Sequence, residues 1–244
     1  SVEASVHDAD YNYFERKDGI VIYRYLGDDV NIVIPNEING KPVVEISTKA
    51  FKNKGLTHVE IPETVLIIGF EAFKGNSLST VVIPNAVTEI NYSAFEDNKL
   101  TEVKIPSSVK RIMAFAFQNN ELEKVTFDEG IVGIQSAAFA DNRLTHVTFP
   151  TSLKTIGANA FGGNYILQFT FKGPIKLEKE SLGLMELVNG VFAGWYTDAA
   201  FKNKWNHTVN GPLTIYANWK ITEVAKKIKI DNLSNQQVKL SNLE

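Results

Sequence analysis

Hydrophobic positions recur along most of the chain with a period of 22 residues. The dipeptide Ala-Phe shows this period most clearly. Its copies stand at Ala50-Phe51, Ala72-Phe73, Ala94-Phe95, Ala116-Phe117, Ala138-Phe139 and Ala160-Phe161. Columns of leucine, valine, isoleucine and asparagine keep the same step. Because five columns stay in phase over six copies, the sequence contains an internal repeat.

The consensus of the copies contains the segment V-x-I, whose alternation of apolar and polar residues predicts a short β-strand with one buried face. Proline follows this strand in four copies, at Pro62, Pro84, Pro106 and Pro150. Because proline lacks the N–H that a strand ladder needs, it predicts the end of each strand. A 22-residue unit cannot bury its apolar side alone, so the copies must stack into a solenoid.

The asparagine column has a structural explanation. Its members are Asn76, Asn98, Asn120, Asn142 and Asn164. A tight turn in every coil leaves backbone N–H and C=O groups inside the stack, and a side-chain amide carries the donors and the acceptor that satisfy them. We therefore expect these residues to hold the turns together and not to bind a ligand.

The stretch LTEVKIPSSVKRIMAFAFQNN resembles the BspA-type leucine-rich repeat, whose pattern is L-x-x-V-x-I-P-x-S-V-x-x-I-G-x-x-A-F. The resemblance covers residues 46–171, and with the preceding segment residues 20–171. It implies an α/β leucine-rich-repeat solenoid that is mostly β, with short helical turns and a parallel sheet. The Phe residues of Ala-Phe are expected to stack in its core.

The segments on either side of the repeats resemble two further units. DGIVIYRYLGDDVNIVIPNEINGKPVVEI is similar to the amino-terminal cap of such arrays, with strands expected at 20–25 and 30–34. FAGWYTDAAFKNKWNHTVNGPLTIYANW resembles the carboxyl half of the Listeria-Bacteroides repeat, a β-grasp-like module. The expected organisation is a leader or linker at 1–10, a β cap at 11–45, the solenoid at 46–172, a small β-rich module at 173–220 and a tail at 221–244.

Composition narrows the classes of partner. The formal charge of −3 gives no strong field for nucleic acid, so we expect none as a partner. No apolar run of 18 residues occurs, so membrane insertion is not expected, and the polar start SVEASVHDAD is not a signal peptide. The absence of cysteine excludes disulfides, thiolate metal sites and cysteine nucleophiles. A monomer is expected.

Candidate chemistry is sparse. The sequence contains no Gly-rich phosphate loop, H-E-x-x-H or G-x-S-x-G motif. His58 and His146 share one repeat position but stand four copies apart, about 19 Å at strand spacing. The acidic pairs Asp28-Asp29, Glu96-Asp97 and Asp128-Glu129 fall in predicted turns. We therefore expect no catalytic residue, no metal and no cofactor, and we do not expect an enzyme.

Three surfaces remain as candidates. The outward residues of the V-x-I strands form a candidate protein-binding face, with a plain solvated sheet face as the alternative. These residues are His58, Glu60, Thr80, Val82, Glu102, Lys104, Lys124, Thr126, His146, Thr148, Gln168 and Thr170. Phe70, Tyr92 and Phe115 form an apolar patch if they point outward, although a core position is favoured for Phe70. Trp195, Tyr196 and Trp205 are candidate glycan contacts, against a favoured role in a small core.

The family resemblance also supplies an expectation of function. It implies an exported bacterial protein, located at the cell surface or secreted, that binds host or other extracellular proteins without catalysis, as in adhesion. The alternative is carbohydrate or cell-wall binding through the tryptophan-rich segment.

Overall fold

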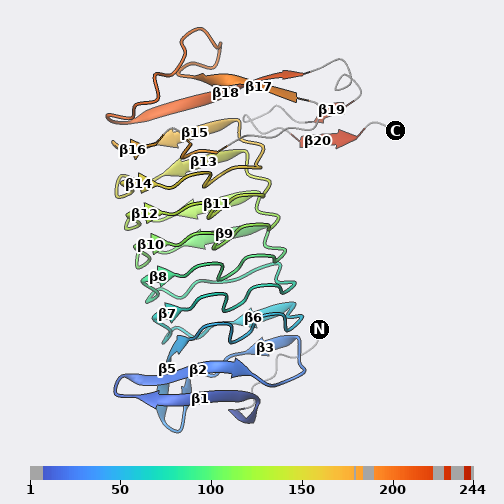
Figure 1. Ribbon diagram of the computed structural model, residues 1–244, viewed down its shortest axis with the longest axis vertical. Coiled ribbons are helices and arrows are strands. Elements are labelled where there is room, and N and C mark those ends of the chain that lie inside the picture. The colour runs from blue at the N-terminus through green and yellow to red at the C-terminus, as the bar shows by residue number, and fades with distance from the viewer. Residues whose placement is uncertain (1–7, 179, 184–189, 222–227, 232–238, 243–244) are drawn as a thin grey trace.

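A computed structural model describes residues 8–178, 180–183, 190–221, 228–231 and 239–242. They form an elongated stack of coils, with a β cap at the amino-terminal end and a β-hairpin at the other end (Figure 1). The predicted leader 1–10 and tail 221–244 lie mostly outside the described residues. Of the tail, β19 (Ile228–Asp231) and β20 (Lys239–Asn242) form an antiparallel pair.

One parallel sheet follows the isoleucine column along the stack. Its strands are β5 (Lys41–Ile46), β7 (Ile67–Ile68), β8 (Glu89–Ile90), β10 (Arg111–Ile112), β12 (Gly133–Ile134), β14 (Thr155–Ile156) and β16 (Lys176–Leu177). Each isoleucine of the column up to Ile134 pairs with the isoleucine of the next coil, for example Ile90 with Ile112, and Ile156 pairs with Leu177. Because these side chains are buried, they fix the register of the sheet.

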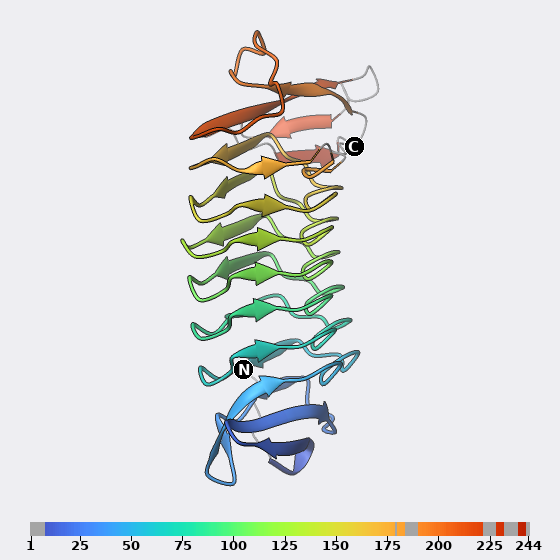
Figure 2. The same ribbon diagram turned by 60° about the vertical axis from the view of Figure 1, so that its left-hand side comes forward.

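The V-x-I strands form the second strand-bearing side (Figure 2). The parallel pairs are β3 (Asn31–Val33) with β6 (His58–Glu60), β9 (Glu102–Ile105) with β11 (Lys124–Phe127), and β13 (His146–Phe149) with β15 (Gln168–Phe171). Residues 80–83, between β6 and β9, form no strand. The sequence predicted a strand in this copy as in the others, and the structure forms none here. The strands end at or before the prolines, as predicted.

The Ala-Phe segments form the third side as hydrogen-bonded turns. In the described repeats they are turns and not α-helices, and the one helix among all described residues is the 3₁₀ turn η1 (Asp8–Asp10). The residue before each alanine has a positive φ, as in Glu71 at 52°. Backbone N–H groups then donate to the next coil, as Phe51 does to the Ala72 carbonyl at 2.8 Å. The turns therefore carry their own coil-to-coil ladder.

The phenylalanines of Ala-Phe stack along the core. From Phe51 to Phe161 the neighbouring ring centroids lie 5.1–5.4 Å apart, at interplanar angles of 5–14°. All six side chains are fully buried. Tyr25 extends the stack at the amino-terminal end, 5.4 Å from Phe51. This confirms the predicted core column.

The asparagine column links neighbouring coils. Asn120 Oδ1 accepts the Leu100 N–H of the preceding coil at 3.0 Å. Its Nδ2 donates to the carbonyls of Phe95 at 2.9 Å and Phe117 at 3.1 Å. The other members repeat this pattern, so the predicted structural role is confirmed. These members are Asn76, Asn98, Asn142 and Asn164.

The amino-terminal cap closes the isoleucine sheet. β1 (Tyr11–Arg16) pairs antiparallel with β2 (Gly19–Tyr25), and β2 pairs parallel with β5. β4 (Glu37–Ile38) and β5 form a hairpin around Asn39 and Gly40, whose φ angles of 54° and 72° suit a two-residue turn. This hairpin lies within the segment that the sequence assigned to the cap.

At the other end, a hairpin extends the V-x-I side. β18 (Leu213–Ile221) pairs antiparallel with β15, and β17 (Gly190–Tyr196) pairs with β18. Trp219 Nε1 donates to the Ile166 carbonyl at 3.0 Å. The last repeat strand is therefore covered, which removes an open edge from the stack.

Candidate functional site

The V-x-I side presents two columns of outward side chains. All twelve residues of the candidate protein-binding face are exposed or partly exposed, because the alternate valine and isoleucine positions point into the core. Val81 and Val82 show this contrast most clearly, with 9% and 75% of the side chain exposed. At the carboxyl end β18 flanks the columns, and Thr170 Oγ1 lies 3.3 Å from Thr214 Oγ1. Partner access is therefore greatest over the amino-terminal and central coils.

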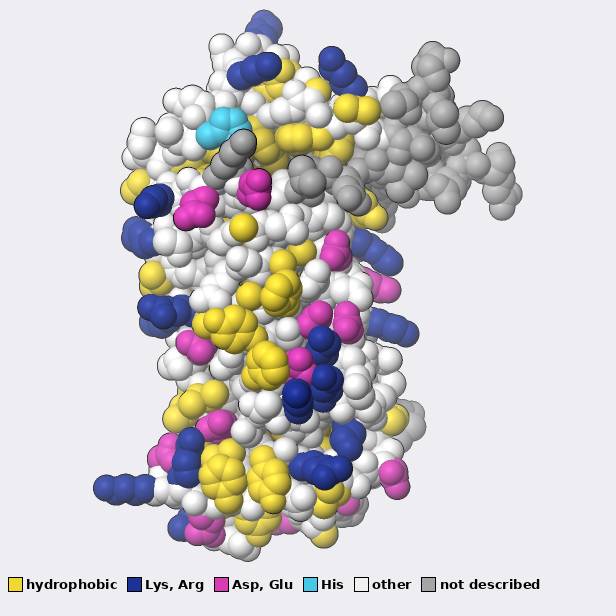
Figure 3. Space-filling view, in the orientation of Figure 1, with side chains coloured by type: hydrophobic (Ala, Val, Ile, Leu, Met, Phe, Trp, Pro, Cys, Tyr) yellow, Lys and Arg dark blue, Asp and Glu magenta, His cyan; other side chains and the backbone are white. Residues whose placement is uncertain are grey.

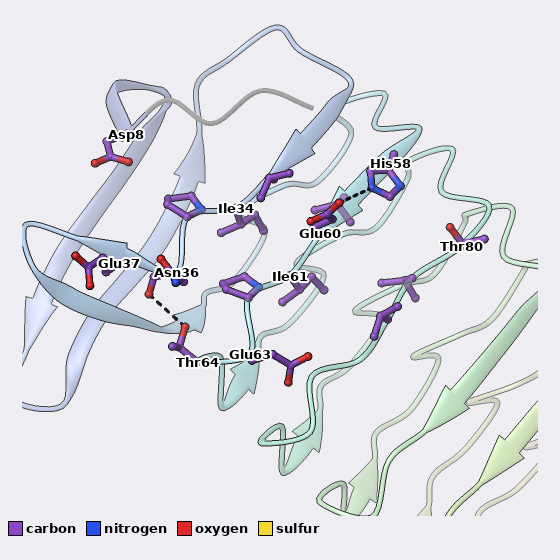
Figure 4. A pocket seen from close by; sticks show the side chains of 16 residues that line it. Asp8, Ile34, Asn36, Glu37, His58, Glu60, Ile61, Glu63, Thr64 and Thr80 are labelled. Atoms are coloured by element: carbon purple, nitrogen blue, oxygen red, sulfur yellow. Dashed lines mark hydrogen bonds and ion pairs between the residues drawn. The ribbon is translucent and has the colours of Figure 1, made fainter. Parts of the chain in front are cut away.

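A groove of about 950 Å³ lies at the amino-terminal end of this side (Figure 4). It covers β3, β6 and residues 80–82, where the strand ladder is interrupted. Its apolar part includes Ile34, Pro35, Ile61, Pro62 and Val82. The register of β3 with β6 brings the two Ile-Pro pairs of successive coils side by side. The groove therefore forms at the ends of these strands, where the prolines turn the chain away from the sheet.

Acidic residues surround the apolar part of the groove. Asp8, Glu37, Glu60 and Glu63 all line it, and Figure 4 shows them distributed around it. His58 Nε2 lies 3.6 Å from Glu60 Oε1. No lysine or arginine lines this groove among the described residues. The amino-terminal end of the V-x-I side is therefore an apolar hollow in a negative field.

The charge changes further along the same side. A second hollow of about 490 Å³ is lined by Lys104 and Lys124 as well as Glu102. A third, of about 400 Å³, is lined by Lys124 and Lys172 with Glu123 and His146. Burial lowers the pKa of His146, so its neutral form is favoured. The V-x-I side thus runs from an acidic end to a more basic one.

Sequence reasoning identified His58, Glu60, Thr80 and Val82 of the groove but missed three of its carboxylates. Asp8, Glu37 and Glu63 lie outside the V-x-I segments, in the leader, the cap hairpin and the turn after Pro62. No repeat column marks them, because Asp8 and Glu37 precede the 22-residue repeats and the column of Glu63 is acidic again only at Glu129.

The candidate apolar patch lies on the Ala-Phe turns, away from the groove. Phe70, Tyr92 and Phe115 are 39–42% exposed, and the Phe70 and Tyr92 ring centroids lie 6.5 Å apart. The core position favoured for Phe70 is therefore wrong, because the Ala-Phe column already fills the interior at this level. The Lys49 ammonium lies 5.9 Å from the Phe70 ring centroid. Exposed apolar groups between charged ones are visible on this face in Figure 3.

The tryptophans of the carboxyl-terminal segment are packed inside the protein. Trp195 and Trp205 are buried, and the Trp195 ring lies 5.3 Å from that of Phe169. Trp205 Nε1 donates to the Thr208 carbonyl at 2.9 Å. Tyr196 is half-buried beside Phe201 at 5.6 Å. Glycan contact by these residues stays a prediction, and their observed contacts are those of a core.

The described part of the chain contains no cluster of three or more histidine, aspartate or glutamate side chains placed to hold a metal ion. Within the same residues, no helix has the length and apolar character to cross a membrane.

Comparison with known proteins places these features in a family. The model of the BspA type leucine rich repeat region matches residues 44–168 in six copies. Because this match ends at residue 168, the Listeria-Bacteroides resemblance at 192–219 stays a prediction. No curated protein sequence matches the chain.

Three solved structures are similar to the chain. The leucine rich repeat protein of T. pallidum is 30% identical, with 64% of this chain and 66% of that protein covered and a TM-score of 0.48. The pneumococcal vaccine antigen PcpA is 22% identical, covering 72% and 50%, with a TM-score of 0.55. A leucine rich cell surface protein of Faecalibacterium prausnitzii is 24% identical, covering 70% and 55%, with a TM-score of 0.51. The chain spans about half to two thirds of the length of these proteins.

Proposed function

Since the chain belongs to the BspA-type leucine-rich repeat family, we propose that it is a noncatalytic protein-interaction module that binds its partner across the V-x-I side. The observation that carries this proposal is the groove of about 950 Å³ with Val82 at 75% exposure in its lining. An apolar side chain so exposed, beside further apolar groups, is typical of a surface that a partner covers.

The extent of the V-x-I side favours a protein as the partner. Three hollows follow one another along the strands, and Val82 lines both the first and the second. A row of shallow hollows suits an extended polypeptide surface better than one small ligand, which is usually enclosed on most sides. Within the described residues, the groove carboxylates are spread around its rim and are not paired for acid–base chemistry.

We further propose that the module acts outside a bacterial cell, in adhesion or another contact with extracellular protein. The F. prausnitzii protein is described as a cell surface protein and PcpA as a vaccine antigen. Both are relatives by fold, and they support this location for the present chain as part of the proposal.

Partner capture with matched variants tests the proposal. The wild type, Val82→Asp and Phe115→Asp are immobilised and exposed to proteins released from the surface and surroundings of intact cells. Both substituted side chains are exposed, so neither variant is expected to lose its fold. We expect a partner that is retained by the wild type and by Phe115→Asp, and at least tenfold depleted on Val82→Asp, because a carboxylate is placed on the apolar surface.

The opposite pattern of retention would place the interaction on another side of the stack. A partner that is lost with Phe115→Asp and retained with Val82→Asp would move the interaction to the patch of Phe70, Tyr92 and Phe115. A partner that resides only in the cytoplasm would contradict the proposed location.

A further inference from the structure

We infer that the acidic groove binds an extended peptide segment in which lysine or arginine stands next to apolar side chains. This inference rests on the proposed function and specifies the chemistry of the partner. Its basis is charge complementarity between the groove rim and a cationic segment, combined with an apolar floor.

Within the described residues, the one ionisable partner of a groove carboxylate is His58, which lies beside Glu60. Among the described residues, no ion pair joins Asp8, Glu37, Glu60 or Glu63 to a lysine or arginine. Glu63 Oε2 instead accepts the Asn85 N–H at 3.2 Å, and it remains exposed.

Two lysines close to groove residues pair with other carboxylates: Lys41 lies on the strand paired with that of Glu37, and Lys104 lines the neighbouring hollow. Lys41 pairs with Glu15 at 2.8 Å, and Lys104 pairs with Asp128 at 3.6 Å. Among the described residues, no lysine or arginine therefore pairs with the groove carboxylates, and a cationic group of a partner would complement them.

The apolar floor requires an apolar side chain between the cationic ones. Val82 is far more exposed than its neighbour Val81, and it is flanked by the Ile61–Pro62 segment of the preceding coil. A peptide that brings only charges leaves Val82 in water, whereas an apolar side chain seated on it removes both surfaces from water. The lysine and arginine stems can cover the prolines while their charged ends reach the carboxylates.

Because the charge of the V-x-I side changes along the stack, we also expect a charged residue of the opposite sign elsewhere in the bound peptide. Glu60 and Lys124 occupy the two neighbouring outward columns on coils that are three apart, which is about 14 Å along the stack at strand spacing. An extended peptide rises about 3.3 Å per residue, so about four residues span that distance. We therefore expect an acidic residue of the peptide about four positions from the cationic one, over Lys124.

Selection from a displayed library of random peptides tests the inference on the full chain. Peptides of about 12 residues suffice, because they span about 40 Å when extended. We expect selected sequences to be enriched in lysine or arginine beside valine, isoleucine, leucine or an aromatic residue. Their binding should weaken as salt is raised, because exposed charge interactions are screened.

Two charge-reversal variants decide where the selected peptides bind. Glu37→Lys with Glu60→Lys alters the rim, whereas Glu178→Lys with Glu180→Lys makes the same change in net charge at exposed positions near the other end. We expect peptide affinity to fall about tenfold or more with the rim variant and to change less than about twofold with the control.

The remaining outcomes separate this inference from the proposed function. Selected peptides without cationic residues, or peptides that bind the rim variant as well as the wild type, overturn the inference. If such peptides are still lost with Val82→Asp, the groove binds protein but not by charge. If no selected peptide is sensitive to Val82→Ser, which removes the apolar side chain without adding a charge, the inference and the proposed function both fail.

Discussion

Replacing Phe117 by alanine is expected to lower the free energy of unfolding by about 3–5 kcal/mol. The Phe117 ring stacks between those of Phe95 and Phe139, at centroid distances of 5.4 Å and 5.3 Å. Its removal leaves a cavity in the middle of a continuous column, and the coils on either side cannot close it without breaking their backbone ladders. Chemical denaturation followed by circular dichroism measures the loss.

Phe115 provides the matched control for this experiment. It lies two residues away in the same turn and is 42% exposed. Its replacement by glycine removes a large side chain but keeps the positive φ of 63° accessible. We expect a change of less than about 1 kcal/mol. Equal losses for Phe117→Ala and Phe115→Gly would show that the column is not the main source of stability.

Replacing Asn120 by alanine is expected to cost about 2–5 kcal/mol. The substitution leaves the Leu100 N–H and the carbonyls of Phe95 and Phe117 without the amide that joins them. These backbone groups lie between two coils, where water has little access. Each group that loses its hydrogen bond therefore stays desolvated without a partner, which lowers the free energy of unfolding. The same denaturation measurement applies.

Asn119 provides the matched control. Its substitution shows whether the loss of stability comes from the asparagine ladder or from removing any asparagine of this turn. It is exposed, its φ is 55°, and its Nδ2 donates to Asp97 Oδ1 at 2.8 Å on the surface. Asn119→Gly retains the left-handed conformation and loses only that surface contact, so we expect less than about 1 kcal/mol. A loss for Asn120→Ala no larger than that for Asn119→Gly would contradict the proposed ladder.

The parts of the fold that recur in every coil could be predicted from the sequence. A column such as Phe73, Phe95 and Phe117 repeats because each ring packs on the next, so the period itself shows which side chains meet. Asn98 and Asn120 follow the same logic, since one amide serves two successive turns. Repetition turns a long-range contact into a local pattern that sequence reasoning can detect.

The candidate site depends instead on differences between coils. The groove forms because residues 80–83 do not continue the strand ladder and because the cap brings Glu37 next to the turn that carries Glu63. The antiparallel pairing of β18 with β15 was equally hidden, because it joins segments that share no repeat pattern. The exposure of Phe70 was misjudged because its column contains a large side chain in only some coils.

Site-specific photo-crosslinking is the most direct test of binding through the V-x-I side. A photoreactive amino acid is placed at position 82 in one protein and at position 115 in another, both exposed positions on different sides of the stack. Each protein is irradiated with the partner or peptide identified by capture or selection. The account predicts a covalent adduct from position 82 and none from position 115. An adduct from position 115 with none from position 82 would contradict it.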